Sequence, residues 1–198
     1  MENTNELSRR KFIASTALGA IGTIGAAGLL ASCAGAEIKG PEVKLPEMLD
    51  TAPDGKVLRA GLIGCGGRGT GAAINFIDAG PNLQIVALGD VFQDKLDTCR
   101  ATLKKERNIE IDDAKCFTGF DNYQKVIDAG VDIVLLCTPP HFRPLHVEAA
   151  VNAGKHVFME KPVAVDPVGA RSVLVSSKKA AQMGLSMVSG TIRRVQKD

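Results

Sequence analysis

Charge of one sign, cysteine and aromatic side chains are all in short supply in this sequence. Its 198 residues carry 24 basic and 22 acidic side chains, so no strongly basic stretch marks a nucleic-acid-binding face. Five cysteines are too few for a small disulfide-dense scaffold. A hydrophobic content of 45% excludes a disordered chain, which combines low hydrophobicity with high net charge. There is no tryptophan and one tyrosine, whereas glycine, with 21 residues, is in excess. These features indicate one ordinary globular domain that does not bind nucleic acid.

The N-terminal segment has the layout of a targeting signal rather than of a folded element. Residues 12–36 carry no charge and follow three basic side chains at residues 9–11. A basic patch before an apolar stretch is typical of an export signal, and residues 8–13 resemble a twin-arginine signal. We therefore expect residues 1–32 to be an export signal.

The end of this apolar stretch points to a lipid anchor. Residues 30–33 resemble a lipobox, in which Cys33 becomes the lipidated first residue of the exported protein. Two alternatives are an ordinary small-residue cleavage site and an uncleaved transmembrane anchor, because 25 uncharged residues can span a bilayer. Glycines at positions 19, 22, 25 and 28 of the stretch disfavour a spanning helix. We expect an exported protein on the periplasmic face of the membrane, anchored at Cys33, with a proline-containing tether over residues 33–55.

From residue 56 onward, apolar strand patterns alternate with helix patterns. A parallel sheet whose connections are helices produces this alternation, with helices on both faces. The sequence therefore predicts a doubly wound α/β domain of the Rossmann type over residues 56–198. The expected strands are residues 57–63, 83–88, 115–117, 131–137, 155–159 and 185–188.

The ends of several helices carry recognisable signals. A glycine just past a helix supplies a left-handed turn, which we expect at Gly80, Gly130 and Gly154. Asp121, with Gln124 three residues later, predicts a capping box. Residues 166–167, an Asp-Pro pair, are expected to open the last helix of the domain.

A glycine cluster directly after the first strand indicates what the domain binds. Residues 64–69 match the pattern GxGxxG, which lies between a predicted strand and a predicted helix. Gly64 permits a tight turn, Gly66 lets the backbone approach a diphosphate, and Gly69 lets the helix pack closely on the strand. The helix N-terminus then offers free N–H groups to the phosphates. The alternatives are a glycine-rich turn without a ligand and a methyltransferase-type nucleotide site.

Asp90 strengthens the dinucleotide interpretation. It ends the second strand 21 residues after Gly69, where a carboxylate meets the ribose hydroxyls of the adenosine half. A carboxylate accepts hydrogen bonds from a free 2′-hydroxyl and repels a 2′-phosphate, and residues 91–93 contain no arginine to compensate. NAD is therefore predicted over NADP, although Lys95 is a nearby cation.

A second group of polar residues follows the later strands. Residues 138–146 read TPPHFRPLH after the fourth strand, and Glu160, Lys161 and Pro162 follow the fifth. Together with GxGxxG, in this order, these motifs resemble the Gfo/Idh/MocA family (glucose–fructose oxidoreductase, inositol dehydrogenase and relatives) over residues 57–194. Members of that family are NAD(P)-dependent oxidoreductases that act mainly on sugars and cyclitols.

The resemblance implies roles for individual residues. Lys161 would lie beside the nicotinamide and the substrate hydroxyl, with Glu160 bonded nearby and His146 at the edge of the site. The peptide bond between Lys161 and Pro162 would be cis. These expectations make Lys161, Glu160 and His146 the catalytic candidates. The cofactor-binding candidates are Gly64, Gly66, Gly67, Arg68, Gly69, Asp90, Thr138, Pro139 and His141.

Other interpretations of these side chains stay open. Lys161 could be an exposed loop lysine, and the three histidines could make local hydrogen bonds only. Many bacterial relatives read TPDHWH where this sequence has Arg143 in the last position, so no histidine stands there for a proton relay. The cysteines from Cys65 onward lack metal-ligand spacing and are interpreted as packing residues, with no metal site.

The resemblance also implies a second α/β domain that closes the substrate pocket and often forms an oligomer interface. The sequence stops near the point where that domain would begin, which suggests a truncated reading frame. Three hypotheses follow: the cofactor half of an exported sugar or cyclitol oxidoreductase, a non-catalytic dinucleotide-binding module, or an NAD-dependent redox glycosidase. The motif at residues 160–162 favours the first, and the resemblance implies a homo-oligomer.

Overall fold

The computed structural model describes residues 55–191. The predicted signal at residues 1–32, the lipid site Cys33 and nearly all of the predicted tether lie outside these described residues. Among the helices of residues 55–191, none combines the length and apolar character needed to span a membrane.

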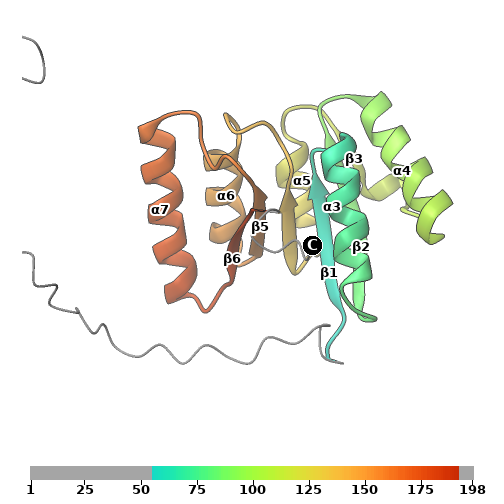
Figure 1. Cartoon of the computed structure of the whole chain (residues 1–198), viewed down its shortest axis with the longest axis horizontal. Coiled ribbons are helices and arrows are strands. Elements are labelled where there is room, and N and C mark those ends of the chain that lie inside the picture. The colour runs from blue at the N-terminus through green and yellow to red at the C-terminus, as the bar shows by residue number, and fades with distance from the viewer. Residues whose placement is uncertain (1–54, 192–198) are drawn as a thin grey trace, which may run out of the picture. The chain divides into compact units, whose positions relative to one another are not determined.

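Six parallel strands form a single sheet in the order β3-β2-β1-β4-β5-β6 (Figure 1). The chain moves outward from β1 to β3, returns to the other side of β1, and then moves outward again. The strand order therefore reverses between β1 and β4, and this reversal opens a crevice at the carboxyl ends of the strands. The strands are β1 (Leu58–Ile63), β2 (Leu83–Asp90), β3 (Cys116–Thr118), β4 (Ile133–Leu136), β5 (His156–Glu160) and β6 (Met187–Gly190).

Helices cover both faces of this sheet, which confirms the predicted doubly wound fold. Helices α3 and α4 pack together on one face, whereas α5, α6 and α7 follow one another on the opposite face. The helices are α3 (Gly67–Asp78), α4 (Gln93–Arg107), α5 (Asn122–Asp128), α6 (Arg143–Asn152) and α7 (Pro167–Gln182), and a short 3-10 helix spans Asp113–Lys115.

The central strands are buried on both faces and supply two hydrophobic cores. Alternate residues of a strand point to opposite faces, so Leu62 joins the core beneath α3 and α4 and Ile63 joins the core beneath α5, α6 and α7. Leu135 and Leu136 divide in the same way. A near-continuous apolar run is the pattern of such a doubly covered parallel strand.

Two of the three predicted glycine turns are confirmed. Gly130 and Gly154 have φ values of 86° and 70°, so each supplies the left-handed turn between a helix and the next strand. Gly80 has no positive φ, and the prediction there was wrong. The physical reason is Pro81, because a proline restricts the preceding residue to extended conformations.

The two predicted helix starts also differ in outcome. Asp166 has extended backbone angles, and its carboxylate accepts a hydrogen bond from the Gly169 amide at 2.6 Å, so it caps α7. Asp121 occupies the equivalent place before α5 but makes no capping bond, so the predicted capping box was wrong. Its backbone lies in a turn conformation, with φ of −90° and ψ of 3°, and its carboxylate pairs with Lys125 at 2.9 Å instead.

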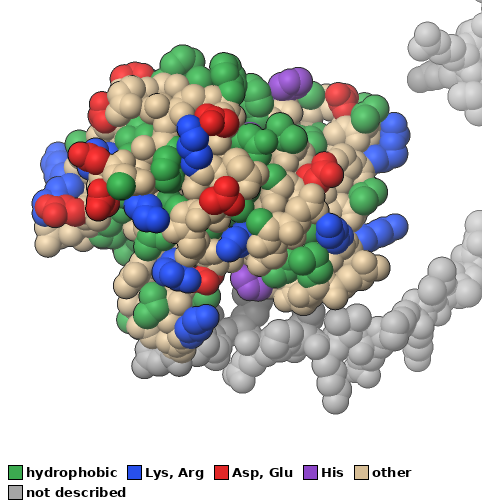
Figure 2. All heavy atoms as spheres, turned by 180° about the vertical axis from the view of Figure 1, so that it is seen from behind, with side chains coloured by type: hydrophobic (Ala, Val, Ile, Leu, Met, Phe, Trp, Pro, Cys, Tyr) green, Lys and Arg blue, Asp and Glu red, His purple; other side chains and the backbone are tan. Residues whose placement is uncertain are grey.

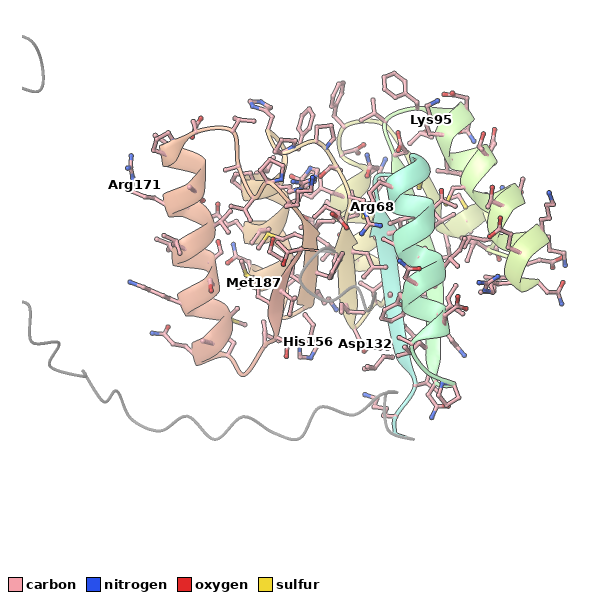
Figure 3. The ribbon with its side chains drawn as sticks, viewed as in Figure 1. Arg68, Lys95, Asp132, His156, Arg171 and Met187 are labelled. Carbon is pink, nitrogen blue, oxygen red and sulfur yellow. The ribbon has the colours of Figure 1, made fainter. Side chains whose placement is uncertain are left out.

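Charged side chains of both signs are interspersed on the face of the domain seen in Figure 2. At the amino edge of the sheet, Arg59 and Asp132 form an ion pair at 3.2 Å. His156 lies at the same edge, where its Nδ1 accepts a hydrogen bond from the Ser186 amide at 2.9 Å (Figure 3). This edge is opposite the crevice, so His156 has only a local role.

Candidate functional site

The glycine loop after β1 forms one wall of the crevice, and its glycines serve two purposes. Gly64 has φ of 96°, and a Cβ there would lie 2.7 Å from the Cys137 carbonyl carbon of the neighbouring β4 loop. A Cβ on Gly69 would collide with the Gly64 carbonyl oxygen, so α3 can approach β1 only because residue 69 is glycine. Gly66 and Gly67, by contrast, face open space. The loop is thus held tightly from behind and exposes bare backbone in front, as the spacing predicts.

The N-terminus of α3 opens onto this exposed backbone. Its N-cap, Gly66, has no side chain to bind the first amides, and its first turn contains no acidic residue. The Thr70 hydroxyl contacts the carbonyls of Cys65 and Gly66 rather than the free amides. Unpaired amides at a helix N-terminus carry partial positive charge, so this end of α3 can receive an anion.

Asp90, at the end of β2, is held in place by two backbone amides. One carboxylate oxygen accepts a hydrogen bond from the Cys65 amide at 2.6 Å, and the other accepts one from the Phe92 amide at 3.0 Å. The first of these bonds joins the carboxylate to the glycine loop. Each oxygen keeps a further lone pair for a hydroxyl donor.

The opposite wall is made by the loops that follow β4 and β5. His146, on α6, is only 5% exposed, and its ring stacks on Tyr123 with centroids 4.4 Å apart. Its Nδ1 lies 3.4 Å from the Thr138 hydroxyl. Burial lowers the pKa of His146 from 6.5 to about 4, so the imidazole is neutral at pH 7.

Arg143 joins the two loops of this wall. Its guanidinium donates hydrogen bonds to the Thr138 carbonyl at 2.6 Å and to the Pro162 carbonyl. The side chain is only 4% exposed, its Nε has no partner, and burial lowers the pKa of the guanidinium. The sequence marked Arg143 only as a departure from relatives, because a link between two loops depends on their tertiary contact.

Glu160 and Lys161 end β5 at the same wall. The Glu160 carboxylate is buried and accepts hydrogen bonds from Nε of Arg68, at 2.8 Å, and from its Nη2. Lys161 is exposed, and the peptide bond that joins it to Pro162 is cis, as the resemblance implied. We call the wall formed by the glycine loop and Asp90 the glycine wall, and the wall formed by the loops after β4 and β5 the lysine wall. The ion pair of Arg68 with Glu160 joins these two walls.

Between the two walls lies a cavity of about 740 Å³, within the size range of cofactor and ligand sites. Four cations line it, Arg68, Lys95, Arg143 and Lys161, against two carboxylates, Asp90 and Glu160. Most of the predicted site residues meet here. Gly67, Gly69 and His141 are not part of the lining, and His141 is an exposed residue whose ring packs edge-on against Phe142.

Several residues that line the cavity were not predicted from the sequence. Phe92 and Phe120 are large, exposed aromatic side chains at the rim, 63% and 71% exposed. Asn122 is buried, and its Oδ1 has no hydrogen-bond partner. A buried acceptor without a donor, a glycine cradle open to the cavity and an excess of cations together suit a polar, anionic ligand such as a dinucleotide.

The cysteines of the described residues are packing residues, as predicted. Cys65, Cys99, Cys116 and Cys137 all belong to, or pack against, the core beneath α3 and α4. Burial raises the pKa of the Cys137 thiol to about 12, which keeps it protonated. The Cys137 thiol is therefore not a reactive thiolate.

Comparison with known proteins gives one family. A family model named GFO_IDH_MocA, described as an oxidoreductase family with an NAD-binding Rossmann fold, matches residues 58–187. Inositol 2-dehydrogenase of Paracoccus denitrificans is 34% identical over 140 residues, which are 69% of this chain and 38% of that protein. A glycosyl hydrolase family 109 protein of Solibacter usitatus is 37% identical over 115 residues, which are 57% of this chain and 25% of that protein.

Solved structures agree with this result. The scyllo-inositol dehydrogenase of Lactobacillus casei, solved with bound NAD(H) and scyllo-inositol, is 28% identical with a TM-score of 0.57. The match covers 72% of this chain and 38% of that one. The chain therefore spans less than two fifths of the length of these relatives.

Proposed function

This chain belongs to the Gfo/Idh/MocA family of oxidoreductases with an NAD-binding Rossmann fold, and from that premise we propose what its cavity does. We propose that the cavity binds NAD between the glycine wall and the lysine wall, as the cofactor half of an oxidoreductase. The reaction would transfer a hydride between NAD and the carbon of a C–OH group on a sugar or cyclitol.

One observation carries this proposal: the N-terminal turn of α3, which can receive an anion, and Lys161 line the same cavity at the switch point of the sheet. The amides after Gly66 suit the diphosphate of a dinucleotide. The Asp90 carboxylate would accept hydrogen bonds from the hydroxyls of the adenosine ribose. Lys161 lines the same cavity, and in this proposal the nicotinamide would lie beside it.

The chemistry divides between the cofactor and the chain. When bound, the nicotinamide supplies the hydride acceptor or donor. The Lys161 amine then accepts or returns the proton of the substrate hydroxyl, which is general acid–base chemistry. Arg143 binds one carbonyl from each of the two loops of this wall, and the buried, neutral His146 also lines the cavity.

The preference for NAD over NADP follows from the charges around Asp90. Its carboxylate would repel a 2′-phosphate. Lys95 is the cation that could offset this repulsion, but its ammonium pairs with Asp94 at 3.3 Å. We therefore expect NAD to bind more tightly than NADP.

The direct test is calorimetric titration with NAD and with NADP, carried out on the full wild-type chain and on its Asp90→Ala variant. We expect Asp90→Ala to weaken NAD binding by about tenfold or more, since hydrogen bonds to a charged group contribute about 1.5–3 kcal/mol. The variant should also narrow the difference between NAD and NADP. Folded wild-type protein that gives no heat with millimolar NAD would contradict the proposed function.

A second candidate is an NAD-dependent glycosidase that oxidises a sugar hydroxyl transiently and then eliminates the aglycone. The similarity to glycosyl hydrolase family 109 proteins favours it. The motif of Glu160, Lys161 and Pro162 favours the simple oxidoreductase. The two differ in net cofactor change: the oxidoreductase accumulates NADH with a polyol, whereas the glycosidase leaves the NAD pool unchanged. A non-catalytic module would bind NAD and do neither.

We further propose export with a lipid anchor at Cys33, supported by the sequence of residues 8–33. Labelled palmitate should enter the wild-type protein and not the Cys33→Ser variant. An unlabelled wild-type protein would rule out the anchor. Association into a homo-oligomer is a separate proposal, which light scattering of the purified chain would test.

A further inference from the structure

Arg68 carries a charge that does not suit its place in the fold. It is the second residue of α3, in the first turn of the helix. The N-terminus of a helix carries partial positive charge, so a cation there is unfavourable unless an anion accompanies it. The first turn of α3 provides no acidic residue of its own.

The chain supplies the missing anion from the other wall of the cavity. Glu160 is 92 residues away in sequence, yet one of its carboxylate oxygens accepts hydrogen bonds from both Nε and Nη2 of Arg68. The two partners differ in burial: the Glu160 side chain is 6% exposed and the Arg68 side chain is 41% exposed. Figure 3 shows Arg68 leaving α3 toward the neighbouring strands. Glu160 is therefore the fixed partner, and Arg68 is the one with room to move.

A diphosphate bound at the glycine loop would need the same guanidinium. Gly66 and Gly67, which face open space, immediately precede Arg68. Arginine binds phosphate and carboxylate with the same N–H fork. A diphosphate and the Glu160 carboxylate are both anions, so both attract the Arg68 guanidinium, and one guanidinium fork cannot serve both fully.

We propose that Glu160 and the cofactor diphosphate compete for Arg68, so that cofactor binding draws Arg68 away and frees the Glu160 carboxylate beside Lys161. This inference rests on the proposed NAD site and adds a positioning role for the pair. Coupling between two binding events is reciprocal. The factor by which the Arg68–Glu160 ion pair weakens cofactor binding is therefore the factor by which bound cofactor weakens that ion pair. The affinity of the glycine wall for the cofactor thus depends on whether the Glu160 carboxylate, on the lysine wall, holds Arg68.

Competition and a purely structural ion pair predict opposite changes in cofactor affinity when Glu160 is removed. If the pair only braced the fold, removing either partner would weaken cofactor binding or leave it unchanged. If Glu160 instead held Arg68 in position for the phosphate, removing Glu160 would also weaken binding. Under competition, removing Arg68 weakens binding and removing Glu160 strengthens it.

The test is calorimetry of the full chain with ADP-ribose, which contains the diphosphate but no nicotinamide, and with adenosine, which has no phosphate. Arg68→Met should weaken ADP-ribose binding by about thirtyfold, the range for a charge-assisted hydrogen bond. Glu160→Gln, which keeps the shape of the side chain, should strengthen it by about fivefold, typical of coupling between two sites. The double variant should bind like Arg68→Met alone, because Glu160 acts only through Arg68. Adenosine binding should not change in any variant.

Glu148→Gln is the matched control, since it makes the same carboxyl-to-amide change at an exposed position of α6. It should leave ADP-ribose binding unaltered. Thermal melting confirms that each variant folds, and Arg68→Lys, which keeps the charge, should bind ADP-ribose between wild type and Arg68→Met. Weaker or unchanged ADP-ribose binding by folded Glu160→Gln would overturn the competition while wild-type binding of NAD still supported the proposed function. Absence of any binding by the wild-type chain would instead contradict the proposed function itself.

Discussion

The two walls of the cavity are built in different ways. The glycine wall presents backbone: the amides after Gly66, with Asp90 held by the amides of Cys65 and Phe92. The lysine wall presents side chains, in which Arg143 joins two loops and Glu160 reaches across to Arg68. The glycine wall can bind a ligand because side chains are absent there and leave the backbone accessible. The lysine wall depends instead on particular side chains that are present.

This difference determines how each wall tolerates substitution. A backbone wall fails when an added Cβ meets main-chain atoms that cannot move. A side-chain wall fails when a buried group loses its partner or changes its charge. Two experiments test one wall each, and a third compares two helix caps; they follow in order from the largest expected effect to the smallest.

Substitution of Gly69 tests the glycine wall. A Cβ at this position would meet the Gly64 carbonyl oxygen, a backbone atom, so Gly69→Ala should lower the free energy of unfolding by more than about 3 kcal/mol. Gly71→Ala is the control on the same helix, because a Cβ there meets no atom within 4 Å. It should raise stability by up to about 1 kcal/mol through helix propensity. Urea denaturation measures both changes, and equal effects would show that close packing at Gly69 does not matter.

The pH dependence of stability tests the lysine wall, because His146 is a buried titratable group of that wall. The pKa of His146 is about 4 in the folded protein, whereas its ordinary value, which applies to the unfolded chain, is 6.5. Between pH 4 and pH 6.5 the unfolded chain therefore binds more protons than the folded protein. The stability contributed by neutral His146 is therefore complete above pH 6.5 and is lost as pH falls toward 4. The loss amounts to about 3 kcal/mol at about 1.4 kcal/mol per pKa unit.

The variant His146→Phe keeps a ring on Tyr123 and cannot titrate. We expect its stability to fall less than that of the wild type between pH 6.5 and pH 4, as measured by urea denaturation at several pH values. His156→Gln serves as the control, because His156 lies at the far edge of the sheet and bonds only locally. Parallel pH profiles for wild type and His146→Phe would show that His146 is not buried as a neutral group.

The smallest effect compares two helix starts. Asp166→Ala should cost about 1 kcal/mol, because it removes the bond to the Gly169 amide that caps α7. Asp121→Ala should cost only a few tenths of a kcal/mol, since Asp121 makes no capping bond and its ion pair with Lys125 is exposed. Thermal melting of the two variants gives the comparison, and equal losses would mean that sequence position alone, not backbone angle, decides the cap.

The outcomes at individual residues show why sequence patterns reached some features and not others. The turn at Gly64 and the close approach at Gly69 were predicted because spacing within one loop dictates them. The turn at Gly80 was wrong because Pro81 changed the local preference, and the cap at Asp121 was wrong because its backbone is in a turn. Arg143 and Asn122 were missed as site residues because nothing in their neighbourhoods signals what lies across the cavity.

The sequence by itself determined the order of strands and helices, the glycine loop and the acid at the end of β2. Each of these rests on residues close together in the chain, where backbone geometry and hydrophobic period act locally. Only the tertiary structure decided that Arg143 would bind two separate loops and that Glu160 would hold Arg68. Those contacts join residues from different strands, and they form only after the sheet brings the carboxyl ends of its strands to one edge.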